Sequence, residues 1–362
     1  MNVLLVDDSR TFRRAVSRML REEPDIEAVY EATDGEEGVS EAVSRRPDLV
    51  VMDLEMPNLD GYGAIDRIMR SEAACPIVVL SASVDGPSSF AAARCFEVGA
   101  VEVLRKPTSM TVGAFRRRLV SVLRTMSKAR IVRRKNALPD PLSPPRPPVA
   151  PARTRPVVAA KPRPVVSRTP RPRPRSGKIR PGIVAIGSST GGPPVLYELL
   201  KAMPQPLLCP VVIAQHILPG FDAGLARWLS GSGHEVILVD KPTPMVPGKV
   251  YLAPGDRHMV LKGTMLQLAQ PADGDMVPSA DELMQSVARE YGPDALGLVL
   301  TGMGRDGADG LLAMRQAGAS TFAQTAATCA VNGMPQAARD AGAVEESLPP
   351  KALGVMLSKR LA

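Results

Sequence analysis

The sequence predicts an α/β protein made of two doubly wound parallel-sheet domains, joined by a linker rich in proline and arginine. In residues 1–127 and 182–362, short apolar runs alternate with segments of helical periodicity. Residues 128–181 differ, because 14 of the 36 prolines lie within 139–181, many of them next to arginine. A segment of this composition cannot bury a core, so we expect it to be extended and disordered.

The first domain is predicted to alternate strands with helices. We expect strands at residues 3–6, 27–31, 49–52, 77–80 and 101–104. We expect helices at residues 9–20, 36–43, 90–98 and 112–123. This alternation is typical of a parallel sheet covered by helices on both faces.

Side chains with chemical function follow the apolar runs of this domain. They are Asp7, Asp8, Asp53, Ser81 and Lys106. In a doubly wound sheet, such groups gather at the carboxyl ends of the strands. Three converging carboxylates favour Mg²⁺, and a lysine with a hydroxyl suits a phosphoryl group, for which a carboxylate is a possible acceptor. Any one of these residues is explained as well by a helix cap or a solvated turn, but the set of five favours a site.

Residues 1–125 resemble a response-regulator receiver domain, which has a flavodoxin-like fold. The resemblance rests on the stretches Val6–Ser9, Asp53–Gly61, Ser81–Ser83 and Lys106–Pro107. It implies that Asp53 is the phosphorylation site.

The same resemblance implies further roles for the strand-end residues. It implies that Mg²⁺ binds to Asp7, Asp8 and Asp53, and that Ser81 and Lys106 contact the phosphate. It also implies a cis peptide bond before Pro107. The sequence departs from the family at Val103, where an aromatic switch residue is usual, so we expect phosphorylation to be relayed mainly through Ser81.

The second domain is also predicted to be α/β. We expect strands at residues 183–186, 210–215, 235–239, 249–253 and 296–301, and a hairpin formed by residues 259–261 and 265–269. We expect helices at residues 195–200, 283–290 and 311–316.

A glycine-rich turn, Gly187–Gly192, links the first of these strands to a helix. Residues 187–191 match G-x-S-x-G, the spacing of a nucleophile elbow, with Ser189 at its centre. Glycine permits a sharp turn, and the helix start offers free N–H groups to a developing negative charge. The motif alone favours a simpler interpretation, a plain turn or a phosphate cradle without chemistry.

A hydrolytic site would also need a base and an acid that orients it. The chain has three histidines, and His216 is the best candidate because it follows an apolar strand, as Ser189 does. Asp306 follows a third strand and a second glycine-rich turn. The order Ser, His, Asp differs from that of α/β-hydrolases, so we do not expect that fold.

Residues 182–357 are similar to the catalytic domain of the chemotaxis protein-glutamate methylesterases, which is Rossmann-like. The motifs that carry the similarity are Ile186–Pro193, Gln215–His216, Tyr251–Met259, Pro278–Asp281, Leu300–Gly307 and Gly333–Pro335. The resemblance implies Ser189 as nucleophile, His216 as base, Asp306 as orienting acid and the Met303 N–H as oxyanion donor, with no cofactor at this site. Ser188 replaces the family's commoner alanine.

Together the two resemblances imply a phosphorylation-activated hydrolase. It would remove methyl groups from glutamate methyl esters on chemoreceptors, and would also deamidate receptor glutamines, giving sensory adaptation. A chemotaxis histidine kinase would supply the phosphoryl group, and the unphosphorylated receiver would cover the substrate groove. The protein would reach the membrane only through its receptors.

Two other functions remain as alternatives. One is a receiver-controlled adaptor with little esterase activity. The other is a DNA-binding regulator, which the net charge of +8 suggests. However, residues 130–180 alone carry +14, leaving −6 for the remainder, and no helix-turn-helix is recognisable, so we expect no specific nucleic-acid binding. The basic linker is a solvated spacer or a contact for acidic partners or the membrane face.

The remaining composition favours a cytoplasmic protein. No apolar run is long enough to cross a bilayer, and the chain enters its first strand without a signal peptide. The four cysteines are scattered, as expected for reduced, buried thiols.

Overall fold

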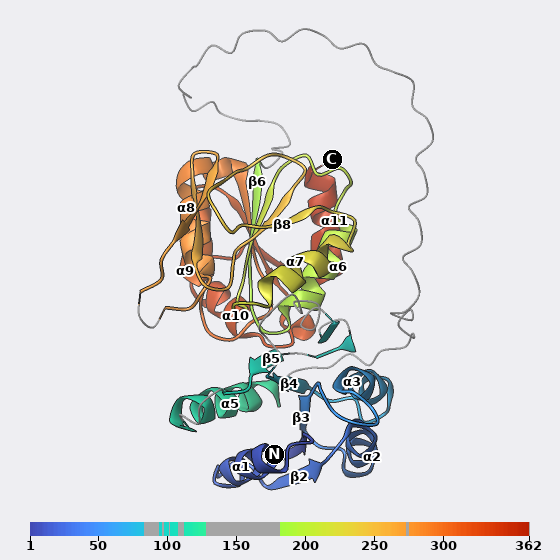
Figure 1. Cartoon of the computed structure of the whole chain (residues 1–362). Coiled ribbons are helices and arrows are strands. Elements are labelled where there is room, and N and C mark those ends of the chain that lie inside the picture. Colours follow the sequence, from blue (N-terminus) through green and yellow to red (C-terminus); the bar gives the residue numbers. More distant parts are fainter. Residues whose placement is uncertain are drawn as a thin grey trace, which may run out of the picture.

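A computed structural model of the chain describes residues 1–82, 94–95, 98–100, 102–107, 112–127, 182–272 and 275–361. It contains two α/β units, an N-terminal one and a C-terminal one, which face each other in Figure 1. The predicted linker at 128–181 and most of the predicted helix at 90–98 lie outside the described residues.

The N-terminal unit is a five-stranded sheet with helices on both faces. Its strands are β1 (Asn2–Val6), β2 (Ala28–Ala32), β3 (Leu49–Asp53), β4 (Ile77–Ser81) and β5 (Glu102–Arg105). Its described helices are α1 (Arg10–Arg21), α2 (Gly35–Arg45), α3 (Gly61–Arg70) and α5 (Val112–Met126). All neighbouring strands are parallel, in the order β2-β1-β3-β4-β5, which is the flavodoxin-like arrangement that the sequence predicted.

Local sequence explains these elements. Along β1, Leu4 and Val6 enter one apolar cluster while Val3 and Leu5 enter another, because successive side chains of a strand point to opposite faces. The helix α1 begins where Ser9 caps it, since the Ser9 Oγ accepts a hydrogen bond from the Phe12 N–H.

The C-terminal unit has a seven-stranded parallel sheet and a smaller three-stranded antiparallel sheet. The strands are β6 (Ile183–Ser188), β7 (Val211–Gln215), β8 (Val236–Leu238), β9 (Thr243–Pro244), β10 (Val250–Leu252), β11 (His258–Lys262), β12 (Met265–Ala269), β13 (Ala295–Val299), β14 (Ser320–Gln324) and β15 (Glu346–Leu348). The α-helices are α6 (Gly192–Ala202), α7 (Asp222–Ser230), α8 (Ala280–Tyr291), α9 (Ala308–Gln316), α10 (Gly333–Asp340) and α11 (Pro350–Leu361).

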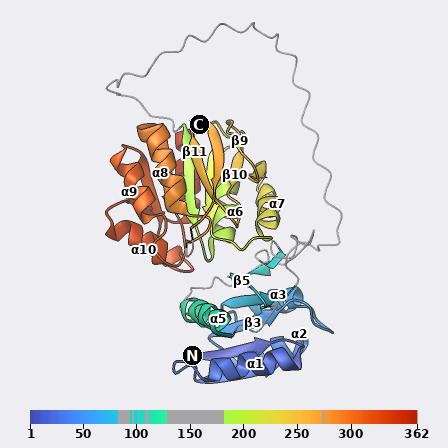
Figure 2. The same cartoon turned by 60° about the vertical axis from the view of Figure 1, so that its left-hand side comes forward.

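The central strand of the large sheet is β6. The order is β15-β14-β13-β6-β7-β10-β8, so β13 and β7 flank β6 although they are far from each other in the chain. The chain therefore leaves β6 toward one side of the sheet and later returns to the other side, which creates a switch point at the carboxyl end of β6. This end of the sheet faces the N-terminal unit (Figure 2).

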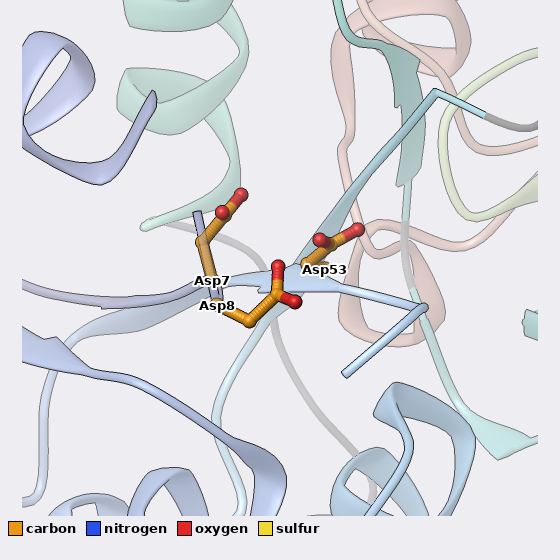
Figure 3. Close-up of side chains that lie close together, drawn as sticks. All are labelled: Asp7, Asp8 and Asp53. Carbon is orange, nitrogen blue, oxygen red and sulfur yellow. The ribbon is translucent and has the colours of Figure 1, made fainter. Parts of the chain in front are cut away.

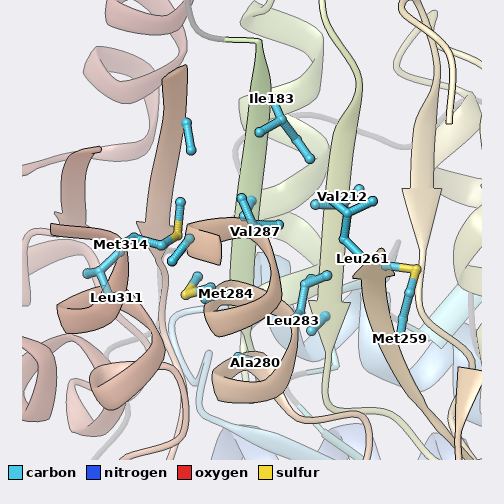
Figure 4. Close-up of a cluster of buried hydrophobic side chains, with 14 of the residues drawn as sticks. Ile183, Val212, Met259, Leu261, Ala280, Leu283, Met284, Val287, Leu311 and Met314 are labelled. Atoms are coloured by element: carbon cyan, nitrogen blue, oxygen red, sulfur yellow. The ribbon is translucent and has the colours of Figure 1, made fainter. Parts of the chain in front are cut away.

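The core of the C-terminal unit is built mainly from aliphatic side chains and methionine, and Tyr251 and Phe322 are also fully buried in it. In Figure 4, α8 lays Leu283, Met284 and Val287 over β6, and Leu311 and Met314 of α9 extend the same layer. Leu283, Met284 and Val287 are fully buried. None of the described helices has the length and apolarity needed to span a membrane.

Several predicted elements need correction. The predicted strand at 101–104 is β5 at Glu102–Arg105, one residue later, and the helix predicted at 283–290 begins at Ala280 because Ser279 caps it. The sequence prediction missed α3, α7, α10, α11, β14 and β15. The strand β14 begins with Ser320 and ends with Gln324, and it pairs with β13 and β15.

The predicted cis bond before Pro107 is wrong. Within the described parts of the chain, the cis peptide bonds precede Pro206 and Pro278. The trans isomer is favoured even before proline.

Leu283→Ala should destabilise the C-terminal unit by about 2–5 kcal/mol, because a fully buried leucine leaves a cavity in a close-packed layer. The chain's one tryptophan, Trp228 in α7, allows urea unfolding of this unit to be followed by fluorescence. Val355→Ala removes a side chain that is 50% exposed, so it is the control and should change the free energy of unfolding by less than about 0.5 kcal/mol. Equal midpoints for Leu283→Ala and the wild type would contradict this description of the core.

Candidate active site

Ser189 lies at the turn between the central strand β6 and α6. Its N–H donates to the Thr301 carbonyl at 3.0 Å, which ties the turn to the segment after β13. Gly191 has a φ of 71°, and a Cβ there would lie 2.5 Å from the Ala330 Cβ, so only glycine fits. Gly191 therefore adopts a left-handed conformation in this turn, and Ser189 at its centre is 8% exposed.

A buried amide holds the turn from its other side. Gln215 at the end of β7 donates from Nε2 to the carbonyl groups of Ser189 (2.8 Å) and His216 (2.9 Å). Ser188 donates to Gln215 Oε1 at 2.6 Å, so its hydroxyl fixes the orientation of this amide. The serine that replaces the commoner alanine thus adds a hydrogen bond, and both polar side chains are satisfied although buried.

His216 lies beside this turn and contacts Asp306. The His216 Nε2 lies 2.6 Å from the Asp306 Oδ2, so this nitrogen carries a proton and donates it to the carboxylate. The other ring nitrogen, Nδ1, is buried and has no hydrogen-bond partner among the described residues. It is therefore the ring nitrogen that is free to accept a proton.

Asp306 is held by the start of α8. Its oxygens accept hydrogen bonds from the Ser279 hydroxyl at 3.0 Å, the Ala280 N–H at 2.6 Å and the Asp281 N–H at 3.0 Å. Burial by itself raises the pKa of Asp306, but His216 and the helix N–H groups outweigh burial and lower the pKa to about 2. Asp306 is therefore a carboxylate at any pH near neutrality.

A cleft of about 480 Å³ opens beside Ser189 and His216 and extends to Met303. The backbone after Thr301 passes close to the serine, because a Cβ on Gly302 would lie 2.7 Å from the Ser189 Cβ. Within the described part of the chain, neither the Met303 N–H nor the Thr190 N–H donates a hydrogen bond. Two residues that line this cleft thus have N–H groups available as hydrogen-bond donors.

The N-terminal unit has a second polar cluster at the carboxyl ends of β1 and β3. Asp7, Asp8 and Asp53 converge there (Figure 3), and their carboxylate oxygens lie within 4.8 Å of one another. Hard oxygen ligands grouped in this way fit Mg²⁺. The Lys106 Nζ lies 2.6 Å from the Asp53 Oδ2 and 2.8 Å from the Asp7 Oδ2.

The charges of this cluster are coupled. Burial raises the pKa of Asp53, although Lys106 opposes the shift. Burial opposes the charge on Lys106 as well, but the hydrogen bonds to Asp53 and Asp7 prevail and raise its pKa. Ser81, also buried, ends β4, and its carbonyl accepts a hydrogen bond from the Lys106 N–H at 2.9 Å. All five predicted strand-end residues thus meet at one edge of the sheet.

The N-terminal unit also reaches the Ser189 turn. Thr190, the residue after Ser189, donates from Oγ1 to the Glu102 Oε2 of β5 at 2.7 Å. Burial between the units raises the pKa of Glu102. In α5, Thr125 contacts the Met303 sulfur at 3.5 Å. The N-terminal unit therefore contacts two residues that line the same cleft as Ser189.

An apolar contact accompanies these polar ones. Phe221, five residues after His216, is 4% exposed and lies in the same apolar cluster as Val103 of β5. The position that lacks the usual switch aromatic is thus packed in a cluster with an aromatic ring from the other unit.

The sequence predicted the residues that meet here, but not the residues that hold them by hydrogen bonds. Ser189, His216 and Asp306 follow three adjacent strands, and the predicted Met303 lines the same cleft. The roles of Glu102, Gln215, Ser279 and Thr301 were not predicted. A weak signal existed for Glu102, an acid beside the apolar residues of a short predicted strand.

Asp281→Asn should stabilise the protein at alkaline pH. Burial and the nearby Asp306 raise the pKa of Asp281 from 3.8 to about 6, so its ionised form is disfavoured in the folded state. The resulting loss of folding stability is absent below pH 4, where Asp281 is protonated, and is complete above about pH 7. We expect the variant to gain about 2 kcal/mol at pH 8 and nothing at pH 4, as measured by urea unfolding.

Asp309→Asn is the matched control, because Asp309 is 51% exposed and pairs only at the surface with Arg305. It should change stability by less than about 0.5 kcal/mol at both pH values. A loss of stability in Asp281→Asn at pH 8 would contradict the assignment of a destabilising charge.

Known families match both units. Residues 3–113 match the response regulator receiver domain family, and residues 184–357 match the CheB methylesterase family. A solved structure, the CheB methylesterase catalytic domain of Thermotoga maritima, is 32% identical with a TM-score of 0.48, and the match covers 49% of this chain and 98% of that one.

Curated relatives match nearly the whole chain. Protein-glutamate methylesterase/protein-glutamine glutaminase 2 of Anaeromyxobacter dehalogenans is 37% identical over 96% of this chain and 94% of its own length. Protein-glutamate methylesterase/protein-glutamine glutaminase 4 of Myxococcus xanthus is 39% identical over 92% of this chain and 90% of its own length. The chain therefore belongs to the CheB methylesterase family, with a response-regulator receiver domain in front of its methylesterase domain.

Proposed function

We propose that this protein is a phosphorylation-activated protein-glutamate methylesterase, which also deamidates glutamine side chains of the same substrates. Residues 1–127 are the receiver domain, residues 128–181 the linker and residues 182–362 the catalytic domain. The observation that carries the proposal is the alignment of Ser189, His216 and Asp306 at the ends of three adjacent strands, with a free Nδ1 on His216.

The reaction is acyl transfer through a serine ester. Ser189 Oγ attacks the carbonyl carbon of a glutamate methyl ester while the His216 Nδ1 takes the hydroxyl proton. The C–O bond to methanol breaks, and methanol leaves with that proton. Water then attacks the acyl-enzyme, His216 again takes a proton, and Ser189 leaves with glutamate as product. Asp306 holds the imidazole and stabilises its charged form.

The N–H groups of Met303 and Thr190 are the proposed oxyanion donors. A donor of this kind contributes ~3 kcal/mol to transition-state stabilisation. With glutamine as substrate, the same steps release ammonia instead of methanol. The site needs no cofactor for either reaction.

The substrates are chemoreceptors that carry methylated glutamates, so the enzyme contributes to sensory adaptation. A cleft of about 480 Å³ admits a side chain, whereas a helix is about 10 Å in diameter. The receiver must therefore move away before a receptor helix can reach Ser189.

Phosphorylation of Asp53 drives this movement. The Asp53 carboxylate takes the phosphoryl group of a chemotaxis histidine kinase, whose P–N bond breaks. Asp7, Asp8 and Asp53 would hold Mg²⁺, which would supply positive charge beside the phosphoryl group. Ser81 and Lys106 bind the phosphoryl oxygens. Lys106 follows β5, the strand that carries Glu102 and Val103, so its rearrangement biases the contact with the catalytic domain.

The alternative function is an adaptor that binds receptors without hydrolysing esters. The satisfied network around Ser189 argues against it, because an adaptor has no need for a buried imidazole with one free nitrogen.

Ser189→Ala should abolish methanol release from methylated receptor membranes, with a loss of about 10⁴-fold or more in kcat, because no nucleophile remains. The control is Ser358→Ala, which removes a hydroxyl bonded to the Ala202 carbonyl on α6 and should keep the wild-type rate. Full activity of Ser189→Ala would exclude the proposed mechanism, and a wild type that binds receptors but releases no methanol would favour the adaptor.

Glu102→Ala should raise the rate of the unphosphorylated protein about three- to tenfold. The variant loses one buried hydrogen bond between receiver and catalytic domain, which contributes about 0.5–1.5 kcal/mol to closure. The rate with a phosphodonor should stay within twofold, and Asp53→Asn should remain at the unphosphorylated rate. Glu72→Ala, at an exposed receiver position, is the control. An unchanged basal rate in Glu102→Ala would remove this contact from the control of activity.

A further inference from the structure

Two motifs in the catalytic domain have no role in the mechanism above. They contain His258, the first residue of β11, and Ser279, the N-cap of α8. The His258 side chain is 6% exposed, and its Nδ1 accepts a hydrogen bond from the Ser279 N–H at 3.0 Å. His258 is not among the described residues that line the cleft, so it is not positioned to act on a substrate.

Ser279 connects this histidine to Asp306. Its hydroxyl donates to the Asp306 Oδ1 at 3.0 Å and accepts from the Glu282 N–H at 3.2 Å. The next two residues, Ala280 and Asp281, donate their N–H groups to the same carboxylate. Three consecutive residues thus hold Asp306, so the position of Asp306 depends on where α8 begins.

The start of α8 departs from the usual capping pattern. Residues 279–282 read Ser-x-x-Glu, a capping box in which the glutamate would accept from the N–H of the N-cap residue. Here that N–H donates to His258 instead, and Glu282 is exposed. A partner from another element, in place of the local glutamate, ties the helix start to β11.

A second hydrogen bond joins β11 to α8. The Leu261 N–H donates to the Ser286 Oγ at 2.9 Å, and Ser286 is fully buried. Figure 4 shows Met259 and Leu261 of β11 beside the α8 turns that carry Ala280 and Leu283. The two hydrogen bonds therefore join α8 to β11 at two places, Ser279 and Ser286.

The other ring nitrogen of His258 is oriented by an acid. Nε2 lies 3.5 Å from the Asp275 Oδ2, which also accepts from the Ala272 N–H at 2.8 Å. With Nδ1 as acceptor, the neutral ring carries its proton on Nε2, toward this carboxylate. Both nitrogens are therefore engaged, which leaves His258 no capacity to act as a base.

We propose that His258 is a positioning residue of the catalytic triad, which holds the start of α8 against Asp306 through Ser279 and thereby sets the orientation of His216. This inference rests on the proposed esterase function for its kinetic test, but its spectroscopic test does not. A displacement of Asp306 turns the His216 imidazole, and misplacement of a catalytic group by about 1 Å lowers the rate about 100-fold.

The test compares His258→Leu with His258→Asn in the full chain. Leucine has a similar volume but no acceptor, whereas the asparagine Oδ1 lies near the place of the histidine Nδ1 and accepts from the Ser279 N–H. With a phosphodonor present, methanol release from a glutamate methyl ester peptide should show kcat lowered about 10- to 100-fold in His258→Leu, with KM within twofold. His258→Asn should keep kcat within about threefold of the wild type.

The matched control is His234→Leu, because His234 is equally buried and makes one hydrogen bond, to the Leu200 carbonyl. It should leave kcat unchanged at a temperature where all variants are folded. Equal kcat in His258→Leu and the wild type would overturn the proposal. Equal losses in His258→Leu and His258→Asn, or in His234→Leu, would also overturn it, because they indicate a packing effect.

Proton NMR provides a second test, which needs no substrate. A short hydrogen bond such as that between His216 and Asp306 gives a low-field proton signal, which Asp306→Asn would identify. His258→Leu should shift or broaden this signal, and His258→Asn should preserve it. An unchanged signal in His258→Leu would overturn the inference, whether or not the wild type releases methanol. Absence of methanol release from the wild type would refute only the proposed esterase function.

Discussion

The 2.6 Å hydrogen bond between His216 and Asp306 is the contact around which the catalytic domain is arranged. A buried carboxylate is costly unless several donors satisfy it, and here four donors do so, three of them from the start of α8. With Asp306 held on one side of the imidazole, the opposite nitrogen is left free. The same carboxylate therefore joins the start of α8 to the proposed base.

Close packing is the second requirement of this arrangement. A Cβ on Gly310 of α9 would lie 2.8 Å from the Asp281 backbone, and the Gly310 N–H donates to the Asp281 carboxylate at 2.6 Å. The two helices can meet this closely only at glycine. The same proximity brings the Asp281 carboxylate near the Asp306 carboxylate. The two negative charges repel each other, which contributes to the raised pKa of Asp281.

The receiver contacts the site at two residues that line the cleft beside Ser189. Glu102 binds Thr190, Thr125 contacts Met303, and Phe221 packs into the apolar cluster that contains Val103. These contacts come from β5 and α5, and β5 leads directly into Lys106 at the acidic cluster. The ion pair between Lys106 and Asp53 thus links the acidic cluster to β5, the strand that makes these contacts.

Much of this protein follows from local pattern. Apolar runs that alternate with helical segments predicted both parallel sheets, and the polar residues after those runs predicted both clusters, because the carboxyl ends of parallel strands share one edge. The order in the sheet was not predictable, since β13 lies next to β6 only through packing over more than one hundred residues. The strands β14 and β15 and the helix α11 were missed because their sequences carry weak periodicity and are stabilised by neighbours.

By itself, the sequence determined the fold class of both domains and the residues that meet at each site, because periodicity and strand-end chemistry are local properties. Tertiary structure alone decided which nitrogen of His216 is free, which groups hold Asp306, and which receiver residue reaches Thr190. These depend on contacts between elements distant in the chain, such as Glu102 with Thr190 and His258 with Ser279. A hydrogen bond of this kind requires a donor and an acceptor to be brought within about 3 Å by the packing of whole elements, which no local pattern encodes.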